Sequence, residues 1–350
     1  MEITSILHRA ITMQASDIFI EANIPVKFKK DNQLCPLNND VLTTEDTKQL
    51  ISQIYEIAKR DVDILFNDGD DDFAFSIAHL SRFRVSMFKQ RGSLACVIRI
   101  IAFKLPDFQE LNIPEQLIDL GDQTNGLILF TGPSGSGKST TLACIIDYIN
   151  HKYARHVITL EDPIEYLHVH NKSIITQREI GNDTNCYLTA LRASLRQCPD
   201  VILLGEMRDH ETIETAITAS ETGHLVFSTL HTIGASNTIN RIIDAFPANE
   251  QPQIAMMLSL TLNAVVSQHL VPDISGKLIP VFEIMIVNPA IRNLIREKKI
   301  HQIDSIIESD RQNMVTLDNS LLQLYQDRII SRETVIKYCK NNQYITQKLG

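Results

Sequence analysis

The chain has 350 residues, of which 44% are hydrophobic and 21% charged, a composition typical of a globular protein rather than a disordered one. This length allows two domains that each bury a core. The 33 basic and 42 acidic residues give a formal net charge of −9, which disfavours a general nucleic-acid binder.

The cysteines and the apolar runs indicate the compartment. Six cysteines occur without any C-x-x-C spacing, and the chain opens on a polar amphipathic pattern rather than a signal peptide. We therefore expect reduced thiols in a cytosolic protein. No apolar run approaches the roughly 18–20 residues that a membrane span needs, so a cytoplasmic protein is expected.

The first eighty residues predict helices and short strands. Residues 3–14 favour a helix and residues 17–21 a strand. Residues 43–66 carry apolar side chains at helical spacing and predict one long helix that Thr44 caps. The acidic run at residues 68–72 predicts a solvated turn before the next strand.

Residues 81–101 predict a β-hairpin, because apolar residues alternate on both sides of a turn at residues 90–93. This hairpin contains an unusual concentration of arginines, namely Arg82, Arg84, Arg91 and Arg99. The strand-like alternation then ends, and residues 102–116 contain two prolines. We predict a linker there, between a domain of residues 1–101 and a second domain of residues 117–350.

The second domain contains short apolar runs between helical stretches. Such runs, without alternation, indicate strands buried on both faces and hence the parallel sheet of an α/β domain. The last eighty residues predict helices. The four runs are residues 126–132, 156–162, 200–206 and 224–232.

A phosphate-binding loop follows the first of these strands. The sequence GPSGSGKST fits G-x-x-x-x-G-K-[ST] and leads into a helical pattern, as this loop requires. The glycines let backbone N–H groups surround the phosphates, Lys138 reaches the β- and γ-phosphates, and Ser139 is a predicted Mg²⁺ ligand. The predicted nucleotide-binding residues are Gly132, Pro133, Ser134, Gly135, Ser136, Gly137, Lys138, Ser139 and Thr140.

Acidic residues and histidines stand at the ends of the other strands. Glu161 is placed to orient an attacking water, although a strand-end turn capped by Asp162 explains the same position. Glu206 follows an apolar strand where nucleotide hydrolases keep an acid near Mg²⁺. His231 can hydrogen-bond the γ-phosphate, whereas His224 is read as an ordinary polar residue. Seven residues of strand span about 23 Å, so one zinc ion cannot bind both histidines.

Eight segments together resemble the secretion-type ring ATPases and, among these, the type IV pilus retraction motors PilT and PilU. The resemblance runs from about residue 5 to the C-terminus. The segments are ASDIFI (15–20), RFRVSMFKQRG (82–92), GPSGSGKSTT (132–141), ITLEDPIEYLH (158–168), SIITQREIG (173–181), GEMRD (205–209), TGHLVFSTLHT (222–232) and AIRNLIRE (290–297).

This resemblance implies a fold and a set of roles. The fold is an N-terminal PAS-like α+β domain joined to a C-terminal RecA-like P-loop ATPase domain. The implied cofactors are ATP and Mg²⁺, with Glu161 as catalytic base and Glu206 near the metal. Arg84 and Arg99 would compensate the charge that develops on the γ-phosphate. The chain departs from the family at His269, which stands where an arginine is usual.

The resemblance also implies partners. They are a homohexamer, an inner-membrane pilus platform protein that holds the motor peripherally at the membrane, and a paralogous retraction ATPase, with no nucleic acid. The absence of a four-cysteine insert favours retraction over extension. Within the retraction motors, residues 93–101, 166–181, 259–272 and 315–326 favour the PilU type and residues 290–297 the PilT type. Two alternatives stay open: an ATPase of a secretion or conjugation machine, and a nucleotide-binding ring scaffold without hydrolysis.

Overall fold

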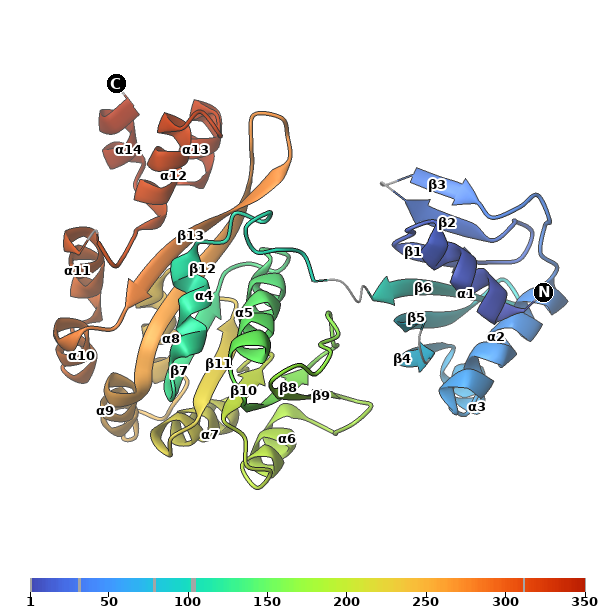
Figure 1. Cartoon of the computed structure of the whole chain (residues 1–350), viewed down its shortest axis with the longest axis horizontal. Coiled ribbons are helices and arrows are strands. Elements are labelled where there is room, and N and C mark those ends of the chain that lie inside the picture. Colours follow the sequence, from blue (N-terminus) through green and yellow to red (C-terminus); the bar gives the residue numbers. More distant parts are fainter. Residues whose placement is uncertain (1, 31–32, 78–79, 102–104, 311, 350) are drawn as a thin grey trace. The chain divides into compact units, whose positions relative to one another are not determined.

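The computed structural model describes residues 2–30, 33–77, 80–101, 105–310 and 312–349. The described residues form two compact units (Figure 1). The first contains the N-terminal residues up to 101 and the short segment 165–167. The second contains residues 105–164 and the residues from 168 onward. Part of the predicted linker, residues 102–104, lies outside the described residues, so its role as a hinge stays a prediction.

The first unit is an antiparallel sheet with helices packed on it, as the PAS-like expectation requires. The strand order is β3-β2-β1-β6-β5-β4. One apolar core joins the helices to the sheet, with Leu7, Ile51 and Phe83 among its fully buried members. The elements are α1 (Ile3–Thr12), β1 (Asp17–Ile20), β2 (Lys27–Lys30), β3 (Gln33–Pro36), α2 (Thr44–Ala58), α3 (Asp63–Asp68), β4 (Asp70–Ile77), β5 (Ser81–Gln90) and β6 (Ser93–Ile101).

The predicted helix over residues 43–66 is wrong in two respects. Thr43, not Thr44, is the N-cap, because its side chain accepts from the backbone N–H of Asp46 while the Asp46 carboxylate accepts from that of Thr43. The helix also ends at Ala58, where Lys59 adopts a left-handed conformation with φ 52°. Residues 63–66 belong to the separate helix α3.

The acidic run is not a solvated turn, which corrects the prediction. Asp71 lies in β4 and is only 6% exposed. Its carboxylate accepts hydrogen bonds from the Tyr55 hydroxyl (2.9 Å) and from the Arg60 guanidinium (2.8 and 2.7 Å). Burial and this carboxylate raise the pKa of Tyr55. A buried ion pair therefore fixes the break between α2 and α3 against the sheet.

The arginine-rich hairpin forms as predicted. Strands β5 and β6 are joined at Arg91 and Gly92, which have φ values of 48° and 81°, as a type I′ turn requires. The register places Arg84 directly opposite Arg99. Arg99 Nε also donates to Asp17 of β1 at 3.0 Å.

The second unit has the predicted parallel sheet at its centre (Figure 1). The order is β13-β12-β7-β11-β10-β8-β9, and all neighbours are parallel except β12 and β13. The predicted strands correspond to four members, and β9 was not predicted. The bounds are β7 (Gly126–Thr131), β8 (His156–Glu161), β9 (Ile174–Glu179), β10 (Val201–Leu204), β11 (Leu225–Leu230), β12 (Leu262–Pro272) and β13 (Leu278–Ile286).

Helices cover both faces of this sheet. One apolar core packs α6 to α11 on one face, and a second packs α4, η1 and α5 on the other. The helices are α4 (Glu115–Ile118), η1 (Asp119–Asp122), α5 (Lys138–Lys152), α6 (Tyr187–Ser194), α7 (His210–Glu221), α8 (Ala235–Asp244), α9 (Gln251–Thr261), α10 (Pro289–Arg296), η2 (Ile300–Gln302), α11 (Ile303–Ser309), α12 (Leu317–Gln326), α13 (Arg332–Tyr338) and α14 (Asn342–Leu349).

The expectation that the last eighty residues are helical is wrong for residues 278–286. These residues form β13, which pairs with β12 through an antiparallel hairpin. Pro280 is tolerated because β13 is the edge strand of the sheet. Helices α12 to α14 then pack on the far end of this hairpin in a small core of their own.

Two global features concern the compartment. All six cysteines are free thiols. Within the described part of the chain, no helix combines the length and the apolar character needed to cross a membrane.

Candidate functional site

The predicted phosphate-binding loop connects β7 to α5. Gly132, Gly135 and Gly137 have φ values of 134°, 74° and 87°, which side-chain-bearing residues rarely adopt. A Cβ atom at Gly132 would also lie 2.2 Å from the carbonyl oxygen of Gln268. The loop therefore needs glycine both for its turns and for its close approach to β12. Helix α5 begins at the end of the loop, and the partial positive charge of its N-terminus favours the binding of an anion there.

Lys138 is the basic centre of this loop. Its ammonium group donates to the carbonyl oxygens of Gly132 (2.8 Å) and Pro133 (2.9 Å), and the residue is 8% exposed. The hydroxyl of Ser136 is buried with no hydrogen-bond partner. Ser139 and Thr140 stand half-buried in the first turn of α5. A buried cation, an unused donor and a glycine cradle fit a chain of phosphates.

Gln268 of β12 supports the loop, and the sequence analysis missed it. The residue is 2% exposed, its side-chain oxygen accepts from the Thr141 hydroxyl at 3.0 Å, and its carbonyl oxygen closes on Gly132. The available signal was a glutamine close after the apolar residues 264–266 of a strand-like run. Gln268 therefore locks the phosphate loop to the neighbouring strand.

Glu161 ends β8 at the carboxyl edge of the sheet, as predicted. One oxygen of its carboxylate accepts from the Thr159 hydroxyl at 2.6 Å and from the Gln177 amide at 3.2 Å. Thr159 precedes it by two residues on the same face of β8, and Gln177 lies beside Thr159 on β9. Two neighbours thus hold this carboxylate in one orientation. Asp162, by contrast, is exposed.

Glu206 and His231 meet at the same edge. Glu206 follows β10, its side chain is 13% exposed, and it pairs with the Arg208 guanidinium and with His231 Nε2 at 3.4 Å. Burial raises the pKa of the nearby Tyr187, and the charges of Asp162 and Glu206 raise it further. His224 lies at the opposite end of β11, where its Nδ1 contacts the carbonyl oxygen of Ala219 at 2.9 Å. The reading of His224 as an ordinary polar residue at the start of the strand stays a prediction.

These positions place the predicted site residues on adjacent strands. Strands β8, β10, β11 and β7 are consecutive neighbours, and each delivers its residues at its carboxyl end. Arg84 and Arg99 belong to the first unit. For a divalent cation, the hydroxyl of Ser139 and the carboxylate of Glu206 are oxygen donors of the kind that Mg²⁺ prefers.

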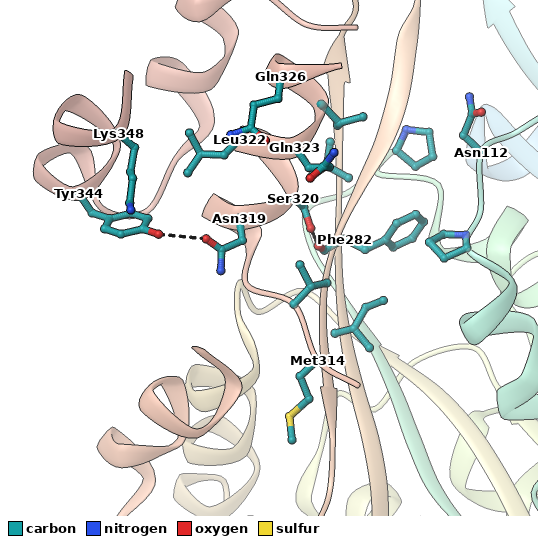
Figure 2. Close-up of a pocket in the computed structure, with 16 residues that line it drawn as sticks. Asn112, Phe282, Met314, Asn319, Ser320, Leu322, Gln323, Gln326, Tyr344 and Lys348 are labelled. Carbon is teal, nitrogen blue, oxygen red and sulfur yellow. Dashed lines mark hydrogen bonds between the residues drawn. The ribbon is translucent and has the colours of Figure 1, made fainter. Parts of the chain in front are cut away.

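A hollow in the second unit lies away from these residues. Figure 2 shows it between β13, α12, α14 and the segment near Asn112, with a volume of about 540 Å³. The Tyr344 hydroxyl donates to the Asn319 side chain at its rim (3.2 Å). Lys348 is the one charged side chain among the residues that line it. The predicted site residues Glu161, Glu206 and His231 do not line this hollow.

Comparison with known proteins shows the family of the chain. The family described as "Type II/IV secretion system protein" matches residues 1–278. The type IV pilus retractation ATPase PilT of Pseudomonas aeruginosa is 42% identical over 97% of this chain and 98% of its own. The type IV pilus ATPase PilU of the same organism is 38% identical over 100% and 92%.

Solved structures give the same result. The crystal structure of the pilus retraction motor PilT with bound ADP superimposes with a TM-score of 0.90 at 43% identity and covers 99% of both chains. The fold and the loop define a P-loop ATPase with a parallel central sheet. The chain belongs to the type II/IV secretion system protein family, in its group of pilus retraction ATPases.

Proposed function

We propose that this chain is the ATPase subunit of a motor that retracts type IV pili. The observation that carries the proposal is the gathering of the phosphate loop, Glu161, Glu206 and His231 at one sheet edge. This set contains each element that phosphoryl transfer to water needs: a phosphate cradle, a carboxylate for the water and a carboxylate for the metal.

In this proposal ATP binds with its phosphates in the loop of residues 132–138. Glu161, held by Thr159 and Gln177, orients the attacking water and accepts its proton. Mg²⁺ held through Ser139 and Glu206 would neutralise charge on the phosphate oxygens. When ATP binds, His231 gives up its present contact with Glu206 and donates a hydrogen bond to the γ-phosphate instead.

Arginines complete the proposed site. Arg84 and Arg99 supply positive charge to the phosphates in the transition state, in their own subunit or in a neighbouring one. A homohexameric ring provides such neighbours. The hydrolysis cycle then moves the two domains about residues 102–116, and the force passes to an inner-membrane platform protein. The motor is proposed to be cytoplasmic, peripheral to the membrane and without nucleic acid.

Two other functions use the same residues. A secretion or conjugation motor shares the chemistry and differs in its partners. A non-hydrolysing ring scaffold would bind nucleotide without turnover, and the orientation of Glu161 by two hydrogen bonds disfavours it. The PilT and PilU relatives have similar sequence identities to this chain, 42% and 38%. The choice between a principal motor and an accessory motor that works with a paralogous ATPase therefore depends on the phenotype of cells.

The direct test is phosphate release from ATP and Mg²⁺ by the purified chain, beside Lys138→Ala. We expect steady turnover by the wild type and none by the variant. In cells that lack the gene, the wild-type copy should restore twitching and Lys138→Ala should not. A wild type that binds ATP without turnover would support the scaffold instead, and restored secretion without twitching would support the secretion motor.

A further inference from the structure

The turn at residues 231–234 joins β11 to α8 and carries His231; we call it the His231 turn. Helix α8 holds part of it. The Thr238 hydroxyl of this helix donates to the carbonyl oxygen of Gly234 at 2.7 Å and lies 2.7 Å from the Thr232 hydroxyl. The His231 side chain is 56% exposed, so packing restrains it little. The backbone of the turn must therefore set the direction in which this side chain points.

Helix α8 begins without a side-chain cap of its own, because its N-cap residue is Gly234. Two buried side chains of β12 and β13 take the place of the cap. The Gly234 N–H donates to the Ser267 hydroxyl at 3.1 Å, and the Ala235 N–H donates to the Glu283 carboxylate at 2.8 Å. A carboxylate is favourable here because a helix N-terminus carries partial positive charge. The His231 turn is thus fixed to two strands as well as to α8.

The Glu283 carboxylate also joins this turn to the C-terminal helices. Its second oxygen accepts from the Lys340 ammonium group at 2.6 Å. Lys340 lies between α13 and α14, where its backbone N–H and that of Asn341 donate to the Asp318 carboxylate of α12 at 2.7 and 2.9 Å. A Cβ atom at Gly234 would lie 2.5 Å from Lys340 Nζ, so the ammonium group also lies directly against the turn. The C-terminal helices therefore supply the counter-ion of the buried Glu283.

We propose that Glu283 is a positioning residue for hydrolysis, which fixes the His231 turn, and that Lys340 makes this positioning depend on the C-terminal helices. The inference rests on the proposed function, in which His231 donates to the γ-phosphate. Such a contact must be placed closely, because a displacement of about 1 Å can cost about a hundredfold in rate. Without Lys340 the buried carboxylate would be left with an unpaired charge, which favours its turning away from Ala235 toward water.

A purely structural role for Glu283 makes a different prediction. If the residue only stabilised the fold, its replacement would reduce the folded fraction of the protein whether or not His231 is present. If it acts through His231, its replacement lowers kcat only while the histidine is there to be misplaced. Residues that act as one unit have non-additive effects on rate, so combined variants separate the two roles.

The experiment is steady-state phosphate release with ATP and Mg²⁺ by Glu283→Gln and Lys340→Met, each alone and combined with His231→Ala. Glutamine keeps the shape of glutamate but has one side-chain oxygen, so it cannot accept from both Ala235 and Lys340. We expect kcat per folded molecule to fall about tenfold in each variant, with KM for ATP and the affinity for ADP changed less than about twofold.

The combined variants carry the decisive comparison. His231→Ala alone should lower kcat about a hundredfold, as expected for losing a donor to the transition state. In this background, Glu283→Gln and Lys340→Met should alter kcat by less than about twofold. Urea unfolding of each variant gives the folded fraction by which its rate is divided.

The matched control is Asp122→Asn. The Asp122 carboxylate accepts from the Lys152 ammonium group at 2.9 Å, an ion pair of the same unit. Asp122 precedes β7 and so lies at the amino end of the parallel strands, whereas His231 follows their carboxyl end. The kcat per folded molecule of this variant should equal that of the wild type.

The outcomes are distinct. A loss of kcat in both variants that disappears in the His231→Ala background supports the inference. Wild-type kcat in either variant, an equal fold loss in both backgrounds, or wild-type kcat in His231→Ala overturns it and leaves the proposed ATPase function standing. A wild type that releases no phosphate overturns the proposed function and the inference with it, and this result is seen before any variant is made.

Discussion

Arg84 and Arg99 lie directly opposite each other on the neighbouring antiparallel strands β5 and β6. Like charges in this arrangement destabilise a sheet by a few tenths of a kcal/mol, up to about 1 kcal/mol. The Asp17 carboxylate, 3.0 Å from Arg99 Nε, offsets part of this repulsion. A like-charged pair that costs stability supports the proposal that these arginines bind an anion.

We therefore expect Arg84→Ala to separate activity from stability. Phosphate release should fall at least a hundredfold because transition-state charge is no longer compensated. Affinity for ADP should change less than threefold, and the free energy of unfolding should hold or rise by a few tenths of a kcal/mol. Turnover, calorimetry and urea unfolding of the purified variant measure the three quantities.

The control for this variant is Arg91→Asn in the same hairpin. Arg91 is exposed in the turn with φ 48°, a conformation that asparagine tolerates. The Arg91→Asn substitution removes one arginine and leaves Arg84 and Arg99 in place, so turnover should stay at the wild-type rate. Equal losses in both variants would mean that the hairpin contributes only its overall charge.

Glu161→Gln tests the proposed base. The amide cannot accept the proton of the attacking water, so kcat should fall about a thousandfold while ATP binding persists. Single-turnover hydrolysis and calorimetry separate the two effects. Asp162→Asn changes the exposed neighbouring carboxylate and should keep more than half of the activity; a larger loss there than in Glu161→Gln would reverse the assignment.

Glu206→Gln tests the metal role. Removing this charge should raise the Mg²⁺ concentration for half-maximal turnover about tenfold. Titration of activity with Mg²⁺ at saturating ATP measures it. The exposed Glu214→Gln in α7 is the control and should leave the titration unchanged. An unaltered Mg²⁺ requirement in Glu206→Gln would exclude a metal role.

Lys340 connects the C-terminal helices to the loop that follows β11. Its ammonium group donates to Glu283 of β13 at 2.6 Å, and the other oxygen of Glu283 accepts from the Ala235 N–H at the start of α8 (2.8 Å). Glu283 is 2% exposed, so Lys340→Met would leave a buried charge unpaired. We expect a loss of about 3 kcal/mol in unfolding free energy, against less than about 0.5 kcal/mol for the exposed Lys337→Met.

His269 predicts a pH dependence of stability. Burial lowers its pKa below the usual 6.5, Lys340 and Lys138 lower it further, and Glu283 opposes them. The unfolded chain then binds the proton more readily than the folded one. The stability that neutral His269 contributes to the folded chain is therefore complete above pH 6.5 and is lost as the pH falls below that value.

Urea unfolding at pH 7.5 and 5.5 measures this effect. His269→Asn should lose less stability than the wild type between the two pH values, whereas the exposed His301→Asn should follow the wild type. If wild type and His269→Asn respond alike, His269 is not the titrating group.

The features that were predictable from the sequence are those with a local signal. The parallel strands are continuous apolar runs, and the phosphate loop is a fixed spacing of glycines and a lysine. Buried pairings gave no such signal. The contacts of Asp71 with Arg60 and of Glu283 with Lys340 join residues that are apart in the chain, and an acidic run looks solvated until its partner is known.

Local competition explains the other errors. The acidic residue that a capping box needs, Asp46, is three residues after Thr43, whereas Thr47 stands at that distance from Thr44, so the spacing that selects Thr43 was overlooked. Strand β13 has a proline and no alternation, so its identity depends on pairing with β12. Gln268 was missed because its contacts, the side-chain bond with Thr141 and the backbone approach to Gly132, join residues far apart in the chain.

The most direct measurement is a count of surface pili, with twitching, in cells whose gene is replaced by the Glu161→Gln allele, beside the wild type. Loss of twitching with pili retained or increased in number is the predicted result, because assembly continues while retraction lacks its ATPase. An increased number of pili would indicate that the chain is the principal retraction motor. An unchanged number would indicate an accessory motor. Cells without pili would contradict the account, since the chain would then power assembly.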